Sequence, residues 1–295
     1  MLIEKVKIEN FGPFAGKHEL EFSINEQKKL NLILGENGSG KTQLFNAMLW
    51  CLYGIEGANF YESKITELLY PNSSIVDNQR DEQTVITKVE MDLIIENKSH
   101  IATREVQFKK TDGKITVDSP KLNIDLGSIL PDPSFIFVKN NGPVIENFNK
   151  KKIYSDKLDK VIHKMNLINQ KSQFKYFANS EFRNVDNKIN LIGREPLEAQ
   201  ALGRKATLDY MFLSSIRGIL IPNSVLIVDS PFDYITPEFV TKIYNFLLEY
   251  MPQIIILETH FHHQNLAIKQ GIAYELVRNP EIHSTAIKRV ETSKN

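Results

Sequence analysis

The fold of this chain is decided by the stretch Gly35-Glu36-Asn37-Gly38-Ser39-Gly40-Lys41-Thr42, which has the pattern G-x-x-x-x-G-K-T. Glycines let backbone N–H groups turn toward an anion, and a helix that begins here directs its positive end at the same anion. Lys41 would reach the β- and γ-phosphates of a nucleotide, and the Thr42 hydroxyl would bind Mg²⁺. The stretch predicts a phosphate-binding loop, against the alternative of a glycine-rich turn without a ligand.

The residues on both sides of the loop support this interpretation. Residues 30–34 form a short, nearly continuous apolar run, as expected of a buried central strand. After the loop, apolar residues recur at helical spacing, and Gly54 stands where a helix commonly ends. These residues are Leu44, Ala47, Met48, Cys51 and Leu52. The order strand, glycine-rich loop, helix is the context that a phosphate-binding loop requires.

Composition excludes several classes of protein. The 295 residues allow a sizeable core, and 36 Lys+Arg balance 36 Asp+Glu, which argues against a strongly cationic nucleic-acid coat. Cys51 is the only cysteine, so a disulfide within the chain and a Cys-x-x-Cys metal hook are both excluded. No apolar run reaches ~18 residues, and the first residues lack a secretory signal pattern. We therefore expect a cytoplasmic protein that does not associate with a membrane itself.

Alternating apolar residues predict an antiparallel part of the fold. Strands are expected at residues 2–9 and around 20–24, and three more in a meander after a surface insertion at 55–80. The meander strands are expected near residues 89–95, 101–108 and 115–117. Asn97 and the pair Asp112-Gly113 mark its turns.

The remaining segments predict alternating helices and strands. Buried strands are expected at 135–138, 225–228 and 254–257, and helices at 152–178, 203–220 and 237–250. A hairpin is expected around Asp186-Asn187, and a short helix and one or two edge strands at the end of the chain. The fold class is therefore α/β, a mostly parallel core sheet with helices plus an antiparallel β-meander lobe.

Residues at strand ends would complete a nucleotide site. Asp229 follows four apolar residues, and an aspartate at the end of a strand beside the loop strand can hold Mg²⁺. The next position is Ser230, whereas ATPases with this kind of phosphate-binding loop commonly carry a glutamate there. Because a base is typically worth ~10²–10⁴-fold, hydrolysis should be slow unless Asp233, Glu258 or a partner supplies a carboxylate. His260 would either hydrogen bond the γ-phosphate or lie solvated in a loop.

Together these features resemble the head domain of SMC/RecF-type ABC ATPases, in the SbcC and DndD branch. The resemblance rests on residues 6–14 and 31–42, Leu52-Tyr53-Gly54, Phe135-Ile136-Phe137, Asp229-Ser230-Pro231-Phe232 and Thr259-His260. It covers essentially the whole chain and is weakest over 55–130 and 145–195. It implies a single bilobed P-loop NTPase of the ABC-ATPase head type, with an N-terminal lobe (1–145), an insert (146–195) and a C-terminal lobe (196–295).

The family resemblance implies a mechanism in which two heads enclose two Mg–ATP molecules. Each ATP contacts one head's loop and the other head's signature motif, usually L-S-x-G. The best candidate here is Gln200-Ala201-Leu202-Gly203, so Gly203 would act in trans and Ala201 replaces the serine. Ala201 and Ser230 leave ATP binding and ATP-driven pairing as expectations, but they argue against fast hydrolysis.

The insert departs from the family pattern, because no heptad run of a long coiled-coil arm is present. The lysines at 150–152, 157, 160 and 164 would form either a DNA-facing patch or a solvated helix face. The apolar stripe of the 152–178 helix would dock either a partner protein or the body of the head.

The resulting hypothesis is an armless head that dimerises on ATP in a bacterial system for DNA repair or phage defence. We expect an effector or nuclease partner, and DNA is a candidate ligand. Two alternatives remain open: a structural or sensor subunit that holds ATP without turnover, and the ATP-binding subunit of a transporter. The step from fold to biological setting is analogy rather than residue chemistry.

Overall fold

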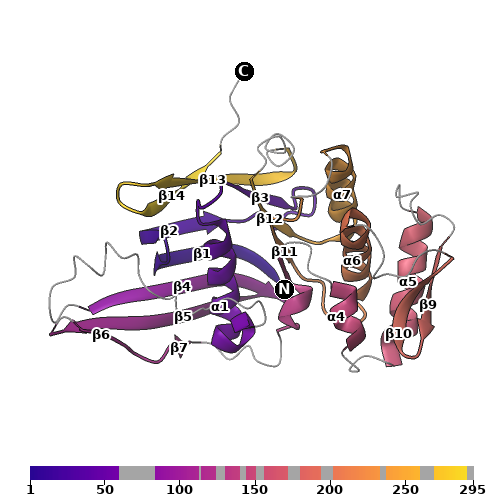
Figure 1. Cartoon of the computed structure of the whole chain (residues 1–295), viewed down its shortest axis with the longest axis horizontal. Helices are drawn as coiled ribbons and strands as arrows, with labels where there is room; N and C mark the ends of the chain where they lie inside the picture. Colours follow the sequence, from indigo (N-terminus) through magenta and orange to yellow (C-terminus); the bar gives the residue numbers. More distant parts are fainter. Residues whose placement is uncertain are drawn as a thin grey trace, which may run out of the picture.

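Two sheets with one helix between them form the body of the molecule (Figure 1). The computed structural model describes residues 1–59, 84–112, 114–123, 130–139, 144–150, 156–171, 180–193, 202–232, 237–259 and 269–290. Among the residues in these ranges, no helix has the length and apolar character needed to cross a bilayer.

The first sheet is antiparallel, as the alternating pattern predicted, with the order β2-β1-β4-β5-β6 and β7 paired to β5. Its strands are β1 (Leu2–Phe11), β2 (Phe14–Glu21), β4 (Thr84–Ile95), β5 (Lys98–Thr111), β6 (Lys114–Val117) and β7 (Lys121–Leu122). The β4–β5 turn contains Glu96 and Asn97, both with positive φ, which is the geometry of a two-residue hairpin turn. One face of this sheet packs on the core and the other carries charged side chains.

The core sheet has the order β14-β13-β3-β12-β11-β8, and all its neighbouring strands are parallel except the β13–β14 pair. Its strands are β3 (Leu30–Leu34), β8 (Phe137–Lys139), β11 (Leu226–Asp229), β12 (Ile254–Glu258), β13 (Gly271–Asn279) and β14 (Ser284–Arg289). Every residue of β3, β11 and β12 is buried, as expected for parallel strands covered on both faces. The expectation of an edge position for the last strands is wrong for β13, which lies between β14 and β3.

Helix α1 (Lys41–Asn59) lies between the two sheets and contacts both (Figure 1). Residues 44–52 are all buried, so this helix is covered all round rather than along one stripe. The prediction that the helix ends at Gly54 is confirmed in part. Gly54 breaks the helix with φ 69° and ψ −160°, but helical structure resumes and continues to Asn59. The predicted insertion at 55–80 therefore starts as helix, and its residues from 60 on lie outside the described part.

On the other side of the core sheet lie α6 (Leu202–Ile216) and α7 (Pro237–Tyr250). Beyond α6 lie α5 (Leu158–Lys171) and the predicted hairpin, now β9 (Glu181–Val185) and β10 (Lys188–Ile192) (Figure 1). Both edges of this hairpin are covered by asparagine side chains. Asn166 bonds the N–H and C=O of Phe182, and Asn149 does the same for Ile189.

Two predicted boundaries are wrong, each for a local reason. The strand expected at 135–138 begins as a 3₁₀ turn (Pro133–Phe135), because the Asp132 side chain accepts from Ser134 N and caps it. The helix that starts near Gly203 ends at Ile216 instead of Leu220, since Gly218 with φ 78° turns the chain back onto the Ile216 carbonyl. The helix predicted at 152–178 contains α5, and residues 152–155 and 172–178 of that prediction lie outside the described part of the chain.

One helix was not predicted at all. Helix α4 (Val144–Lys150) has seven residues, and its Ile145 N–H donates to the Asp209 carboxylate of α6 at 2.9 Å. A cap supplied from 64 residues away leaves no local signal in the sequence.

Candidate nucleotide-binding site

The predicted phosphate loop joins β3 to α1, as the motif requires. Gly38 and Gly40 have φ values of 80° and 104°, a region that residues with a Cβ rarely adopt. A Cβ at Gly40 would lie 3.1 Å from Pro13 Cγ and 3.3 Å from Phe14 Cζ, so the turn between β1 and β2 packs directly against the loop. The loop is therefore a tight backbone turn, and a side chain at either glycine would be strained and would press against the residues packed around the loop.

Lys41 places its cation within this turn. Its buried ammonium donates to Gly35 O at 2.7 Å and to Glu36 O at 3.0 Å. The Ser39 N–H donates to Glu36 O, and the helix begins with Leu44 N–H donating to Gly40 O. The Lys41 ammonium, the N-terminus of α1 and the amides of the glycine-rich loop thus lie together, and this combination suits the phosphates of a nucleotide.

The two predicted Mg²⁺ ligands also come together. The Thr42 hydroxyl donates to Asp229 Oδ2 at 2.8 Å, although 187 residues separate them in the chain. The expectation that β11 lies beside the loop strand is wrong, since β12 lies between them, yet the carboxylate reaches the start of α1. A hydroxyl and a carboxylate are the hard oxygen ligands that Mg²⁺ takes together with phosphate oxygens and water.

Burial raises the pKa of the Asp229 carboxyl above its usual value, and the Thr42 hydroxyl, Lys139 and Lys41 oppose this shift in that order. A buried carboxylate is costly unless a cation compensates it. The residues present therefore fit Mg–ATP, in which the metal would supply that compensation.

Ser230 takes an unusual backbone conformation for its residue type. Its φ is 52°, its N–H donates to Leu257 O at 2.8 Å, and its hydroxyl lies 3.4 Å from Asp229 Oδ1. Backbone strain of this kind clusters at functional sites, and here it directly follows the predicted metal ligand. The side chain supplies a hydroxyl rather than a carboxylate at this position.

The other predicted residues fall into two groups. Gly203 is half-buried in the first turn of α6, and a Cβ there would meet nothing within 4 Å. Glu258 is buried. The pKa of Tyr244 on α7 is raised, first by the burial of Tyr244 and then by the nearby Glu258 carboxylate. Glu258 therefore packs toward α7. The proposed switch His260 and the candidates Asp233, Gln200 and Ala201 lie outside the described residues.

Sequence reasoning missed the contribution of the β13–β14 hairpin. A hollow of ≈ 370 Å³ lies against the outside of the loop, lined by Glu36, Asn37 and Ser39 and by the end of β13. Arg278 Nη1 donates to Gly38 O at 3.1 Å, and Thr285 Oγ1 donates to Ser39 O at 2.9 Å. Neither residue belongs to a motif, so no signal in the sequence marks them.

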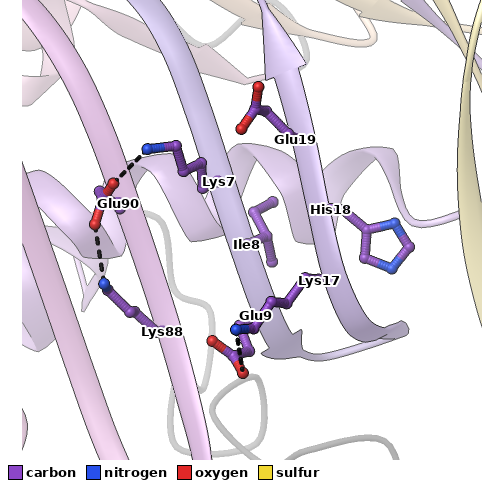
Figure 2. A pocket seen from close by; sticks show the side chains of 8 residues that line it. All are labelled: Lys7, Ile8, Glu9, Lys17, His18, Glu19, Lys88 and Glu90. Carbon is purple, nitrogen blue, oxygen red and sulfur yellow. Dashed lines mark hydrogen bonds and ion pairs between the residues drawn. The ribbon is translucent and has the colours of Figure 1, made fainter.

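A second hollow, of ≈ 290 Å³, lies on the outer face of the first sheet and is lined by charged side chains (Figure 2). Glu90 accepts from Lys7 at 2.7 Å and pairs with Lys88 at 2.9 Å, and Glu9 lies 3.8 Å from Lys17. Lys7 and then Lys88 lower the pKa of Glu90 to about 2. Because the lysines that line this hollow pair with carboxylates, it lacks the uncompensated positive charge that a phosphate-rich ligand needs.

A parallel sheet with a phosphate loop after β3, an aspartate at the end of β11 and an antiparallel sheet across α1 define a P-loop NTPase of the ABC-ATPase head type. The chain belongs to the AAA domain family AAA_23, whose model matches residues 5–209, and is a head domain of the SMC/RecF type.

Individual relatives agree with this assignment. The chain is 29% identical over 128 residues to a DNA double-strand break repair Rad50 ATPase of Methanococcus maripaludis, which is 43% of this chain and 11% of that protein. It is 49% identical over 49 residues to the C component of the nuclease SbcCD from Staphylococcus aureus, which is 17% of this chain and 5% of that protein. The chain thus spans a small fraction of the length of these curated relatives.

Solved structures match over the whole chain. An SmcHead bound to the C-winged helix domain of ScpA has a TM-score of 0.69 at 16% identity, covering 100% of this chain and 99% of that one. The SMC head domain from Thermotoga maritima has a TM-score of 0.60 at 17% identity, covering 99% and 100%. At these identities the match shows the fold.

Proposed function

We propose that the chain binds Mg–ATP and dimerises on it, as the nucleotide-controlled subunit of a bacterial complex that repairs DNA or defends against phage. The observation that carries the proposal is the Thr42–Asp229 pair at 2.8 Å beside the buried Lys41 ammonium. Two oxygen ligands and one cation meet at the end of a glycine cradle, which is the donor set that a metal-bound triphosphate needs.

The residues divide the work of binding. Backbone amides of residues 35–40 and the Lys41 ammonium would bind the phosphates, and Thr42 and Asp229 would hold the metal. The bound metal would neutralise charge between the β- and γ-phosphates. In the dimer, the start of α6 at Gly203 would face the other copy's nucleotide, and the space beside Gly203 supports this.

We infer slow turnover from Ser230. A serine hydroxyl is not a base near neutral pH, and a missing base typically costs ~10²–10⁴-fold in rate. Glu258, the described candidate for a substitute base, is buried with its carboxylate toward Tyr244. Hydrolysis would then need Asp233, His260 or a partner protein to assist water.

The second candidate function, a subunit that holds ATP without hydrolysing it, is favoured by the same Ser230. A steady-state turnover assay with and without double-stranded DNA separates the two functions. Release of phosphate that DNA or a partner stimulates supports the ATPase. Stoichiometric ATP retained through purification without turnover supports the holding subunit.

The biological setting rests on the relatives. One is named for DNA double-strand break repair and another as part of a nuclease. A nuclease or effector partner and a DNA ligand are therefore the first to test. Of the lysines considered for DNA contact, Lys164 donates to Arg217 O at 2.9 Å, so that one serves the fold.

The decisive experiment on binding is Lys41→Ala, with ATP affinity measured by titration calorimetry. Loss of a charged, buried donor should weaken binding at least ~100-fold, equivalent to about 3 kcal/mol. Lys17→Ala is the control, because the Lys17 side chain is 81% exposed on the outer face of the first sheet. If Lys41→Ala binds Mg–ATP as tightly as the parent protein, the proposal is wrong.

A further inference from the structure

The β13–β14 hairpin lies beside β3 in the core sheet (Figure 1), and the end of β13 lines a hollow together with residues of the phosphate loop. Strand β13 pairs in parallel with β3 up to the Glu275–Leu34 position, and β3 then ends while β13 continues to Asn279. The continuing residues therefore flank the loop itself. They lie beyond residues 5–209, the part of the chain that the family model matches.

Thr285 on β14 joins two walls of the site through one residue. Its hydroxyl donates to Ser39 O at 2.9 Å and its backbone N–H donates to Pro13 O at 2.8 Å, and the residue is 1% exposed. Pro13 in turn lies 3.1 Å from the position a Gly40 Cβ would occupy. Thr285 thus connects the loop to the β1–β2 turn on which the loop packs.

Arg278 on β13 holds the preceding carbonyl. Its Nη1 donates to Gly38 O at 3.1 Å, so the hairpin binds the carbonyls of two consecutive loop residues from outside. In a planar trans peptide, the C=O of one residue and the N–H of the next point in opposite directions. Because Thr285 holds the Ser39 carbonyl outward, the Gly40 N–H is directed toward the inside of the loop.

This restraint matters because the loop is rich in glycine. Gly38 and Gly40 have positive φ and lack side chains that would limit their conformations. A flexible loop must be ordered when it binds a ligand, and ordering it in advance improves affinity.

We propose that Thr285 and Arg278 are positioning residues that fix the phosphate loop in its binding conformation before nucleotide arrives. This inference rests on the proposed binding of Mg–ATP and names the segment that controls its affinity. Neither side chain is expected to touch the nucleotide. Thr285 acts through the Ser39–Gly40 peptide and Arg278 through the Gly38–Ser39 peptide.

The test compares three hydroxyl variants of the full chain. Thr285→Val removes the bond to Ser39 O but keeps a β-branched side chain, and Thr285→Ser restores the hydroxyl. Tyr274→Phe is the matched control, since the Tyr274 hydroxyl on β13 bonds Glu21 N and Glu21 O, at 2.9 and 3.0 Å, instead of the loop. The two readouts are the dissociation constant for Mg–ATP and the amide hydrogen exchange of residues 35–44 in the nucleotide-free protein.

We expect Thr285→Val to weaken Mg–ATP binding about fivefold to tenfold, the effect of one neutral hydrogen bond. Its loop amides should exchange faster, with Thr285→Ser close to the parent protein in both readouts. Tyr274→Phe should leave both unchanged. Unaltered affinity and unaltered loop exchange in Thr285→Val would overturn the inference.

A second variant covers the case in which Thr285→Val does not fold. Arg278 is exposed, so Arg278→Gln should fold normally and weaken Mg–ATP binding about threefold, with faster loop exchange. If the parent protein binds no ATP, the proposed function fails, and the exchange measurement still decides whether the hairpin orders the loop. Unchanged exchange in Arg278→Gln counts against the inference.

Discussion

At the scale of single residues, Asp229 is a carboxylate whose charged form burial disfavours in the protein without ligand. It is 1% exposed, and burial raises the pKa of its carboxyl. Its hydrogen-bond partners Thr42 and Ser230 are neutral hydroxyls, and they and the charges of Lys139 and Lys41 offset the effect of burial only in part. Such a residue reduces the stability of the nucleotide-free protein, and in the proposed function it would favour the binding of Mg²⁺.

We therefore predict that Asp229→Asn stabilises the nucleotide-free protein. A raised carboxyl pKa means that the folded state disfavours the charge, so the parent protein loses stability as pH rises above the unfolded pKa. Asparagine carries no charge, so at pH 7 its free energy of unfolding should be about 1 kcal/mol higher, and near pH 4 the difference should shrink. Thermal denaturation at both pH values measures this.

The same variant should lose the response to ligand. Mg–ATP should raise the melting temperature of the parent protein but not of Asp229→Asn, because the metal ligand is gone. Asp118→Asn, at an exposed carboxyl, is the control and should change neither value. A destabilised Asp229→Asn at pH 7 would contradict the assignment of burial as the main influence on this carboxyl.

Residues of the site differ in how far sequence predicts them. The loop glycines, Lys41 and Thr42 are contiguous, and their role depends on local backbone geometry that the order of residues reveals. Asp229 is detectable because it ends an apolar run. Thr285 is not, because its bond to Ser39 O spans 246 residues and exists only through the pairing of β13 with β3.

At the scale of elements, helix α1 joins the two sheets, because it packs against strands of both. Arg104 of β5 donates to Cys51 O near the end of its first segment and lies 5.8 Å from the Trp50 ring centroid. A Cβ at Gly54 would lie 3.1 Å from Arg104 Nη1, so the helix break and this arginine fit together. The antiparallel sheet is thereby attached to the middle of α1, next to its break at Gly54, and the start of the same helix follows the predicted phosphate loop.

The outer face of that sheet supports β1–β4 pairing through ion pairs (Figure 2). Lys7 and Glu90 are direct cross-strand neighbours, and the Glu90 side chain is 17% exposed. The flanking lysines, Lys7 first and then Lys88, lower the pKa of Glu90 from 4.5 to about 2. The ionised carboxylate therefore stabilises the fold above the unfolded pKa, and this stabilisation is lost as pH falls from about 4.5 toward 2.

We predict that Glu90→Gln lowers the free energy of unfolding by about 1–2 kcal/mol at pH 7, allowing for partial screening of the pair by solvent. Urea denaturation between pH 7 and pH 3 should show the two proteins converging as the pH falls. Glu9→Gln is the matched control on the same face, since its partner Lys17 is 3.8 Å away with an 81% exposed side chain. Equal losses in both variants at pH 7 would refute the role given to the Lys7–Glu90–Lys88 group.

The existence of most elements follows from hydrophobic period, while their ends follow from contacts elsewhere in the molecule. Alternation predicts β4 and β5 correctly because one face of the sheet packs on the core. Helix α4 was missed because Asp209 of α6 supplies its cap, and the buried position of β13 follows from its pairing with β3. Such tertiary partners cannot be found from local composition.

At the scale of the whole molecule, the fold places the loop and the start of α6 on separate elements of one chain. If each nucleotide needs one head's loop and another head's Gly203, a single copy is an incomplete site. If Ser230 makes hydrolysis slow, the ATP-bound dimer would be long-lived in the parent protein itself. No substitution that blocks hydrolysis would be needed to observe it.

We predict that Mg–ATP converts the protein from a 33.9 kDa monomer to a species of twice that mass, measured by light scattering after size-exclusion chromatography. A non-hydrolysable analogue should give the same dimer fraction as ATP, because Ser230 provides no base. Lys41→Ala should lose both ATP binding and the dimer. Gly203→Glu should lose only the dimer, since a side chain there meets open space in its own fold but like charge from the bound phosphates of the other copy. A dimer that forms equally without nucleotide, or that survives Gly203→Glu, would mean that the two copies meet through another surface.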